Sequence, residues 1–287
     1  MRPEVSPFLH APSGTFCYVV HDPGTRAGVI VDPCLDFDAK SGRTGTASAA
    51  AVVEHVRRSE LRIDWILETH AHADHLSAAA WLKSQLPGAR VGIGAGICAV
   101  QATFRTVFNL GEQFPVDGRQ FDHLFKDEER LPVGGIEGRV IATPGHTNDS
   151  VSYLIGDALF PGDTLFLPDS GTARCDFPGG SAARLYDSIQ RLYRLPDSTR
   201  VFVCHDYGQE GRSIACETSI GAEKQGNIHL QHDTPAQEFV RVREARDRTL
   251  DMPNLLLPSL QVNIRAGALP EPESNGVRYL KLPIDRF

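Results

Sequence analysis

Imidazole and carboxylate side chains are concentrated in one short stretch of the chain, directly after an apolar run. This stretch reads Thr69-His70-Ala71-His72-Ala73-Asp74-His75. Its side chains are ligands that proteins use for borderline divalent metals. If a strand ends just before the stretch, alternate spacing aims His70 and His72 at one point. The pattern HxHxDH therefore predicts a metal-binding loop. The alternative, a chance cluster of solvated surface histidines, is weakened by the partners found downstream.

Three later segments each supply one further ligand-type side chain after a strand-like run. They are Pro144-Gly145-His146-Thr147, Pro161-Gly162-Asp163-Thr164 and Cys204-His205-Asp206-Tyr207. The glycines before His146 and Asp163 permit tight turns that bring the backbone close to an ion. Together with the first stretch, His146, Asp163 and His205 are what a mononuclear or dinuclear metal site at the edge of two stacked sheets requires.

Apolar periodicity predicts alternating strands and helices around these segments. The elements expected in the first half are a hairpin of strands 15–20 and 27–31, helix 47–58, strand 63–68, helix 78–86, strand 90–93 and helix 97–108. A second sheet is expected from strands 121–125, 139–142, 151–155 and 158–160, followed by helix 185–195 and strand 200–204. Strand 63–68 would deliver the HxHxDH loop at its carboxyl end, where open α/β sheets usually present their chemistry.

The C-terminal part of the chain has a different character. An N-cap threonine, a first-turn proline and a capping-box glutamine in Thr234-Pro235-Ala236-Gln237 predict a helix that runs to about Leu250. Beyond it, 254–287 is broken by prolines and shows no clear period. We therefore expect one domain over 1–287, in which 225–287 is an extension, a helix and an irregular tail, packed on the main body.

Composition excludes several classes of protein. With 287 residues, 41% of them hydrophobic, the chain can bury a full core, and its net charge of −7 argues against a nucleic-acid footprint. Six cysteines without CxxC spacing are typical of reduced thiols in a cytosolic compartment. Neither the N-terminus nor any later run has the apolar length of a signal peptide or a membrane span. A cytoplasmic protein without a membrane partner is expected.

The ordered series HxHxDH, then GHT, then GD, then H resembles the metallo-β-lactamase superfamily, and the resemblance covers roughly Thr15 to Tyr207. It implies an α/β fold, an αββα sandwich with the metal at one edge between the sheets. It does not name a reaction, because that fold hosts hydrolases and oxidoreductases alike.

A closer resemblance is to the persulfide dioxygenases, the sulfur dioxygenase branch, in the bacterial type that has Pro168-Asp169-Ser170 before an arginine motif. It is carried by 68–75, Gly171-Thr172-Ala173-Arg174-Cys175-Asp176-Phe177, His205-Asp206-Tyr207 and Val262-Asn263-Ile264-Arg265. The resemblance implies one Fe(II) per chain, held by His70, His146 and Asp163, a facial triad that leaves positions open for O2 and a thiolate sulfur.

The other ligand-type residues of the motifs then have a different role. In this resemblance His72, Asp74, His75 and His205 orient and tune the iron site without binding it. Were the cofactor two zinc ions, all of them would bind metal, and ligand types alone do not decide between the two cases. That alternative corresponds to a dinuclear zinc thioester hydrolase of the glyoxalase II kind. A third hypothesis, an inactive sulfur-sensing or scaffold protein, gives no reason to keep an intact ligand set.

The implied reaction oxidises glutathione persulfide with O2 and water to sulfite and glutathione. Arg174 matches the family's arginine near the bound thiol, and Tyr207 and Arg265 lie in matching motifs, so these three are the expected substrate-binding residues. The alternatives are an ion pair of Arg174 with Asp176 or Asp169 and packing of Tyr207 on His205.

Other candidate residues have weaker support. A cysteine thiol is more often buried and unreactive than catalytic, so we expect Cys175 to be a buried thiol without a catalytic role. No motif gives His123, His229 or His232 a partner, so we expect surface or core positions for them. A homodimer is compatible with the sequence but is not required by it.

Overall fold

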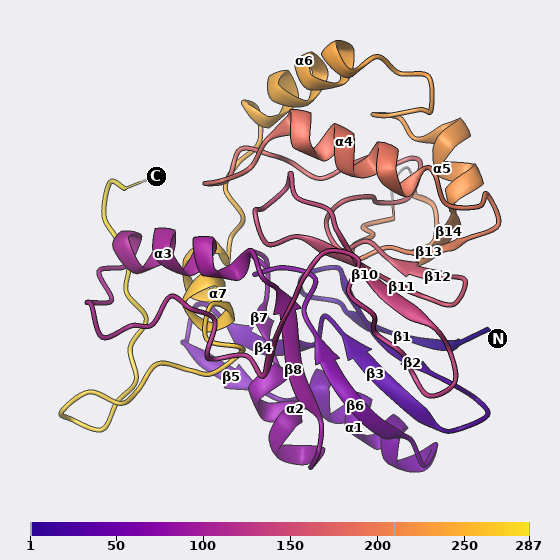
Figure 1. Ribbon diagram of the computed structural model, residues 1–287. Coiled ribbons are helices and arrows are strands. Elements are labelled where there is room, and N and C mark those ends of the chain that lie inside the picture. Colours follow the sequence, from indigo (N-terminus) through magenta and orange to yellow (C-terminus); the bar gives the residue numbers. More distant parts are fainter. Residues whose placement is uncertain (1, 209–210, 287) are drawn as a thin grey trace.

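Two β-sheets face each other in the computed structural model, which describes residues 2–208 and 211–286 (Figure 1). The six-stranded sheet has the order β1-β2-β3-β6-β8-β9 and the five-stranded sheet the order β10-β11-β12-β13-β14. A small sheet, β5-β4-β7, lies beside the first. The strands are β1 (Glu4–His10), β2 (Thr15–His21), β3 (Ala27–Val31), β4 (Cys34–Asp38), β5 (Arg43–Gly45), β6 (Arg62–Leu67), β7 (Leu76–Ser77), β8 (Arg90–Gly94), β9 (His123–Phe125), β10 (Gly138–Ala142), β11 (Val151–Ile155), β12 (Ala158–Phe160), β13 (Arg200–Phe202) and β14 (Glu217–Ser219).

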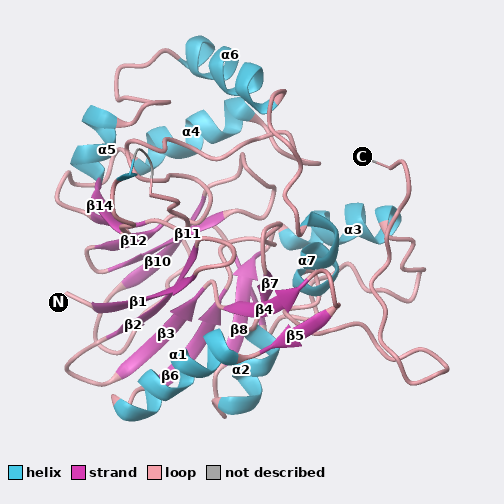
Figure 2. Ribbon diagram, turned by 180° about the vertical axis from the view of Figure 1, so that it is seen from behind, coloured by secondary structure: helices cyan, strands magenta, loops and turns pink. Residues whose placement is uncertain are grey.

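Helices cover the outer faces of both sheets. They are α1 (Ala47–Arg58), α2 (Ala79–Gln85), α3 (Ile97–Val107), α4 (Ala182–Leu192), α5 (Ile220–Gly226), α6 (Ala236–Asp247) and α7 (Leu256–Asn263). Figure 2 shows α1 and α2 in front of the first sheet, and α4, α5 and α6 over the second. The predicted αββα sandwich is therefore confirmed.

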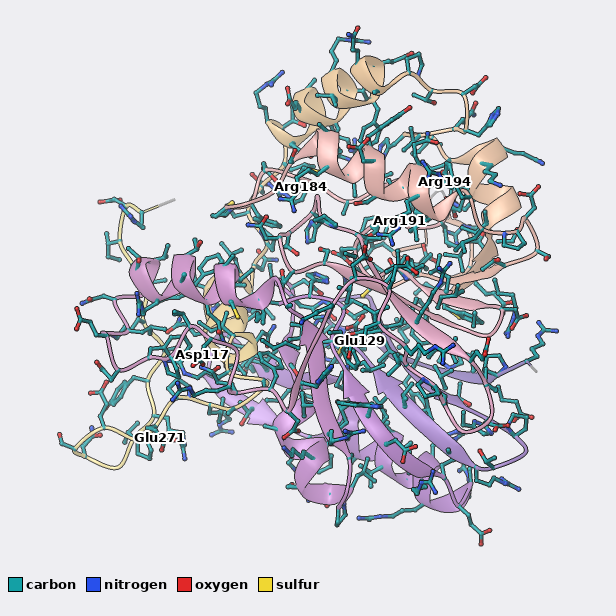
Figure 3. The ribbon with its side chains drawn as sticks, in the orientation of Figure 1. Asp117, Glu129, Arg184, Arg191, Arg194 and Glu271 are labelled. Atoms are coloured by element: carbon teal, nitrogen blue, oxygen red, sulfur yellow. The ribbon has the colours of Figure 1, made fainter. Side chains whose placement is uncertain are left out.

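Helical spacing of apolar residues explains how the outer layers form. On α1, Val52, Val53 and Val56 are buried against the first sheet, and on α4 the residues Leu185, Ile189 and Leu192 are buried against the second. Beside this apolar stripe α4 carries arginines, among them Arg184 and Arg191, which Figure 3 labels. Arg191 bonds to Asp127, and α6 packs on α4 from outside, so α4 lies between the second sheet and α6.

The two sheets share an apolar core between their inner faces, which contains Tyr18, Val29, Phe125, Tyr153 and Phe160. Two buried tyrosines of this core also carry polar bonds across it. The hydroxyl of Tyr18 donates to the carbonyl oxygen of Val203 at 2.5 Å, and that of Tyr153 donates to the carbonyl oxygen of Glu68 at 2.8 Å. The second bond ties β11 to the end of β6, the point at which the HxHxDH loop begins.

Three parts of the predicted first half were wrong. The first sheet begins with β1, which pairs with β2 and was not expected. The segment between β3 and α1, for which no strand was predicted, contains the paired strands β4 and β5. The strand predicted at 121–125 belongs to the first sheet, because β9 pairs in parallel with β8 after the crossover through α3. A βαβ unit of this kind closes within one sheet. Of the other predicted elements of this half, β3 and α1 have the predicted ends, and the rest are present with ends shifted by one residue.

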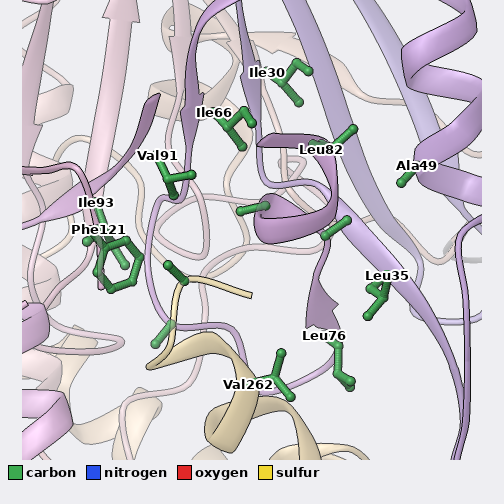
Figure 4. Packing of buried hydrophobic residues seen from close by; sticks show 14 of the residues in the cluster. Ile30, Leu35, Ala49, Ile66, Leu76, Leu82, Val91, Ile93, Phe121 and Val262 are labelled. Atoms are coloured by element: carbon green, nitrogen blue, oxygen red, sulfur yellow. The ribbon is translucent and has the colours of Figure 1, made fainter. Parts of the chain in front are cut away.

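The C-terminal predictions also need correction. α6 begins after Pro235, and the Thr234 hydroxyl accepts a bond from the backbone N–H of Gln231 and does not cap the helix. The tail contains α7, which was expected to be irregular. Its Pro258 lies in the first turn, where a missing backbone N–H is tolerated. Figure 4 shows Val262 of α7 in the same packed cluster as Leu35 and Leu76.

Two further observations concern the whole of the described chain. Over residues 2–208 and 211–286, no helix combines the length and apolar character needed to cross a membrane. All six cysteines are free thiols.

The Tyr153 hydroxyl generates a stability prediction. In Tyr153→Phe, the buried carbonyl of Glu68 loses its donor, so the free energy of unfolding should fall by about 1 to 3 kcal/mol. Urea denaturation followed by circular dichroism measures this change. Tyr279→Phe is the control, because Tyr279 is half exposed, and it should shift stability by less than about 0.5 kcal/mol. Equal stability of the wild type and Tyr153→Phe would refute the proposed tie.

Candidate metal centre

The ligand-type residues of all four motifs converge at one edge of the sandwich. They leave the carboxyl ends of β6, β10, β12 and β13, as the sequence predicted. The histidines are almost completely buried, with exposed fractions of 0 to 4% for His70, His72, His75, His146 and His205. Buried imidazoles need partners, so the hydrogen bonds around them decide which ring nitrogen is free to bind an ion.

Three of these residues form the first candidate site. One donor atom each from His70, His146 and Asp163 lies within 4.8 Å of the others. The rings of His70 and His146 are nearly perpendicular, with centroids 5.1 Å apart, and Nε2 of His146 is 3.7 Å from Oδ2 of Asp163. Two imidazoles and one carboxylate around a common point are a donor set for iron or zinc.

A buried hydrogen-bond chain fixes the tautomer of His70. The Thr69 hydroxyl donates to Oδ2 of Asp32 at 2.9 Å, so it can only accept from Nδ1 of His70, 3.0 Å away. Nδ1 of His70 therefore carries the proton. Nε2 of His70 is left as a lone-pair donor that is buried and without a hydrogen-bond partner among the described residues.

His146 is oriented in the same way. Its Nδ1 lies 2.7 Å from the carbonyl oxygen of Arg174, which can only accept, so Nδ1 donates and Nε2 is free. The backbone carbonyl of Arg174 thus orients His146 independently of the contacts that the Arg174 side chain makes. The N–H of the next residue, Cys175, donates to Asp247 of α6 at 2.8 Å, which anchors this loop to the C-terminal extension.

Electrostatics favours the protonation states that a metal needs. Burial, the largest effect, lowers the pKa of His70 well below its usual value and keeps the ring neutral. Burial alone would raise the pKa of Asp163, but the histidines around it, first His205, lower it. A neutral imidazole and an anionic carboxylate are the ligand forms of these side chains. The buried, unpartnered Nε2 atoms of His70 and His75 are the clearest sign that the residues fit an ion.

A second ligand set lies next to the first. Donor atoms of His72, Asp74 and His75 fall within 4.8 Å of one another. Nε2 of His205 lies 3.2 Å from Oδ1 of Asp163 and 3.6 Å from Oδ2 of Asp74. This arrangement can either tune one ion through Asp163 or hold a second ion.

His72 lies beside His70, with ring centroids 4.0 Å apart, as its spacing predicted, but strand alternation is not the reason. β6 ends at Leu67, so the strand alternation assumed for His70 and His72 does not extend to them. Nε2 of His72 lies 3.0 Å from Oδ1 of Asp32 and 3.6 Å from Oε2 of Glu68. Burial is the largest single effect on His72 and lowers its pKa, but Asp32, Asp74 and Glu68 together outweigh burial and raise that pKa to about 10. Burial raises the pKa of Glu68 to about 8.

The metal-ligand cluster opens into a cavity of about 420 Å3. Asp74, His146, Asp163 and His205 line it on the metal side. The other lining residues come from the loops around 166–177, from the segment after β13 and from the C-terminal extension. They include Phe166, Phe177, Arg174, Tyr207, His229, Arg243, Arg246 and Asp251. A cavity of this size holds a small organic molecule beside the ligand set.

Arg174 and Tyr207 both line this cavity, as expected of substrate-binding residues. The Arg174 guanidinium also makes the ion pair that was the structural alternative. It donates to both carboxylate oxygens of Asp176 at 2.6 and 2.7 Å and to the carbonyl oxygen of Asp251 at 2.6 Å. Asp169 pairs with Arg212 instead. Tyr207 is 67% exposed and its ring is parallel to that of His205, with centroids 6.0 Å apart.

Arg265 is not part of the site, which corrects its expected role. Its guanidinium lies over the Phe114 ring at 4.7 Å and donates to the carbonyl oxygen of Gln261. Asn263, in the same motif, acts in its place. Its amide nitrogen donates to the carbonyl oxygens of His72 and His75 at 2.8 and 2.9 Å. Its amide oxygen accepts from the backbone N–H of Ser77 at 2.7 Å, so α7 fixes the HxHxDH loop.

Several functional positions were missed from the sequence. Asp32 follows β3 directly, so the strand-end rule that found the other polar residues could have found it. His229 was expected to be an ordinary surface or core residue, yet it lines the cavity. Cys204 places its sulfur within 4.8 Å of donor atoms of Asp163 and His205, and burial raises the pKa of this thiol. Burial also raises the pKa of Cys175 to about 12, which agrees with an unreactive thiol.

Comparisons with known proteins agree with this geometry. Residues 10–205 match the family model described as the metallo-beta-lactamase superfamily. The chain is 50% identical over 283 residues to "Beta-lactamase hydrolase-like protein" of Agrobacterium fabrum, covering 99% of this chain but only 65% of that protein. It is 46% identical to "Glyoxylase B2" of Dictyostelium discoideum, covering 98% and 96% of the two chains.

More distant matches carry a different name. The chain is 26% identical to "Persulfide dioxygenase ETHE1, mitochondrial" of Bos taurus, covering 89% of this chain and 85% of that one. Among solved structures, ETHE1 from Myxococcus xanthus superposes with a TM-score of 0.73 at 30% identity, covering 92% of this chain and all of the other. The hydrolase-like protein and Glyoxylase B2 are thus more similar to this chain in sequence than the bovine persulfide dioxygenase is, and a protein named ETHE1 is similar in structure.

The amide of Asn263 generates a prediction about metal affinity. In Asn263→Ala, the carbonyls of His72 and His75 lose their donor and the loop loosens, so metal affinity should fall by about 10- to 100-fold. Competition with a chelator measures this change. Arg265→Ala is the matched control from the same motif and should keep wild-type affinity. Because Asn263→Ala also leaves Ser77 without an acceptor, Asn263→Asp serves as a second variant that keeps this acceptor and loses only the two donors. Unchanged affinity in both Asn263 variants would contradict the role of α7.

Proposed function

The chain belongs to the metallo-β-lactamase superfamily, and we propose that within it the protein is an Fe(II)-dependent persulfide dioxygenase. The proposed substrate is glutathione persulfide. One persulfide, one dioxygen and one water give one thiol, one sulfite and two protons. The terminal sulfur loses four electrons, dioxygen gains four, and the bond between the two sulfurs breaks so that the thiol leaves. A cytoplasmic location is part of this proposal, in keeping with six free thiols.

The observation that carries the proposal is the cluster of His70, His146 and Asp163 beside a substrate-sized cavity. Two histidines and one carboxylate on one side of an ion leave its other positions open for two reactants, which is typical of non-haem Fe(II) oxygenases. When bound, iron would supply the redox chemistry that couples dioxygen to sulfur. The likeness to the bovine persulfide dioxygenase and to ETHE1 from Myxococcus xanthus supports the same activity.

The protein's own residues have defined tasks in this proposal. Thr69 and the Arg174 carbonyl keep the protons of His70 and His146 on Nδ1, so both Nε2 atoms stay available. Phe166 and Phe177 give the cavity an apolar wall that excludes water from the reacting sulfur. His205 lies 3.2 Å from the carboxylate of Asp163 and holds it in place, and His205 is itself oriented by Asp74 and by the Thr15 hydroxyl.

A second candidate function is a dinuclear zinc hydrolase that cleaves a glutathione thioester. The specific observation in its favour is the second ligand set of His72, Asp74 and His75 beside Asp163. The similarity to Glyoxylase B2 of Dictyostelium discoideum points the same way. Both functions use a glutathione-linked sulfur and the same cavity, so they differ in the metal content and in the bond that breaks.

One experiment separates these two functions. Protein loaded anaerobically with Fe(II) should take up oxygen with glutathione persulfide and release sulfite, and metal analysis should give about one iron per chain. The same preparation is tested for thioester hydrolysis. Brisk hydrolysis without oxygen uptake, or about two tightly bound zinc ions per chain, would instead establish the hydrolase.

Removing a ligand of the proposed triad tests the iron site directly. His70→Ala and Asp163→Ala should lose iron on gel filtration and fall to background oxygen uptake, because two protein ligands do not retain the ion. His123→Ala is the control, since His123 lies on β9 and contacts Glu129 away from the cluster. If either triad variant stayed iron-replete and fully active, the assignment of the ligands would be wrong.

A further inference from the structure

Arg212 joins two segments that form different parts of the cavity wall. Its guanidinium donates to both carboxylate oxygens of Asp169, at 2.7 and 3.2 Å, and to both of Asp206, at 2.8 Å each. Asp169 lies in the loop that gives Phe166 and Ser170 to the cavity, and Asp206 lies in the segment after β13. A guanidinium can hold two carboxylates as paired forks, whereas a lysine ammonium has its three donors on one atom.

The Asp206 carboxylate is the buried end of this bridge. Asp206 is 1% exposed, whereas the side chains of Arg212 and Asp169 are 32 and 44% exposed. The two oxygens of Asp206 also accept from the backbone N–H groups of Gly208 at 3.3 Å and Ala215 at 2.8 Å. Four hydrogen bonds thus satisfy this buried carboxylate, and Arg212 supplies the positive charge that compensates it.

The residues on either side of Asp206 both border the cavity. His205 places Nε2 at 3.2 Å from Oδ1 of Asp163, and the Tyr207 ring is parallel to the ring of His205. Both side chains leave the backbone that the Asp206 carboxylate fixes, so a movement of this carboxylate would move both rings. Arg212 therefore acts on the cavity wall and on a candidate metal ligand through one buried side chain.

The β1–β2 hairpin holds the same segment from another side. The backbone N–H of Asp206 donates to the carbonyl oxygen of Gly14 at 3.3 Å. Gly14 has φ +70°, and a Cβ there would lie 2.5 Å from Cε1 of Tyr207, so the tyrosine ring rests directly on the hairpin. The hairpin thus fixes where this segment begins, and Arg212 fixes its distance from the loop that contains Asp169.

We propose that Arg212 is a positioning residue with two tasks, one for each carboxylate that it holds. Through Asp169 it sets the width of the cavity between Tyr207 and the loop around 166–172. Through Asp206 it keeps His205 against Asp163. The inference goes beyond the proposed function and holds for the dioxygenase and the hydrolase alike, because both would use this cavity and these ligands. Only the kinetic part of its test rests on the proposed function.

Absorption spectroscopy of the Co(II)-loaded protein tests the position of His205 without turnover. In Arg212→Ala, Asp206 loses its positive partner and His205 shifts, so the ligand-field bands of Co(II) should change in position and intensity. Asp169→Ala removes only the loop half of the bridge and should leave these bands as in the wild type. Arg119→Ala is the control, because Arg119 pairs with the exposed Asp117 and does not line the cavity.

The kinetics of oxygen uptake separates the two tasks. In Asp169→Ala, KM for glutathione persulfide should rise by about three- to tenfold with kcat nearly unchanged, because only the cavity width changes. In Arg212→Ala, kcat should also fall by about 10- to 100-fold, because His205 no longer holds Asp163. Arg212→Lys should restore only part of this loss, since an ammonium cannot form both forks.

A double variant separates positioning from stability. Arg212→Ala leaves a buried carboxylate unpaired and should lower the melting temperature, and Arg212→Ala/Asp206→Asn removes that charge and should recover most of the loss. Its kcat and Co(II) bands should stay those of Arg212→Ala, because the guanidinium is still missing. Recovery of kcat and bands together with stability, or wild-type bands in Arg212→Ala, overturns the positioning role. Shifted bands in a protein without oxygen uptake would keep this role and end the dioxygenase proposal.

Discussion

The hydrogen-bond chain from Asp32 through Thr69 to His70 is the constraint on which the rest of the site depends. It exists because β3 and β6 pair in parallel, so the residues that follow them emerge side by side. Asp32 adopts φ +49°, a conformation that costs energy for a residue other than glycine. The two hydrogen bonds that its carboxylate accepts from Thr69 offset this cost. The pairing of β3 with β6 thereby determines which ring nitrogen of His70 carries the proton. Without it, His70 would be a buried imidazole with no fixed tautomer.

The C-terminal extension completes this arrangement from two directions. Asn263 of α7 holds the backbone of the HxHxDH loop, and Asp247 of α6 holds the loop whose Arg174 carbonyl orients His146. Asp247 is itself held by the buried Arg243. The segment with the least regular sequence thus helps to position three histidines of the cluster, His72, His75 and His146. These particular contacts are polar bonds to backbone groups, which a search for apolar periodicity does not detect.

The sequence revealed the ligands more reliably than their surroundings. His70, His146, Asp163 and His205 could be predicted because each follows an apolar strand and is preceded or followed by a turn residue. The substrate-binding role predicted for Arg265 was wrong, because a sequence motif does not show which of its side chains turns toward the site. In this motif it is Asn263 that does so. α7 was missed because its proline falls in the first turn. The place of His229 in the cavity wall was missed because its ring is held by the Thr172 N–H, a backbone group that gives no signal in the sequence.

Because Asn263 secures the HxHxDH loop, the ligand cluster cannot reach its final geometry until residue 263 has emerged from the ribosome. A nascent chain that has already folded both sheets would expose the imidazoles of a loop that is not yet fastened. Assembly of the metal-ligand loop is in this way coupled to a helix that is synthesised almost two hundred residues after the ligands it fastens, so these histidines remain unfastened for much of the chain's synthesis.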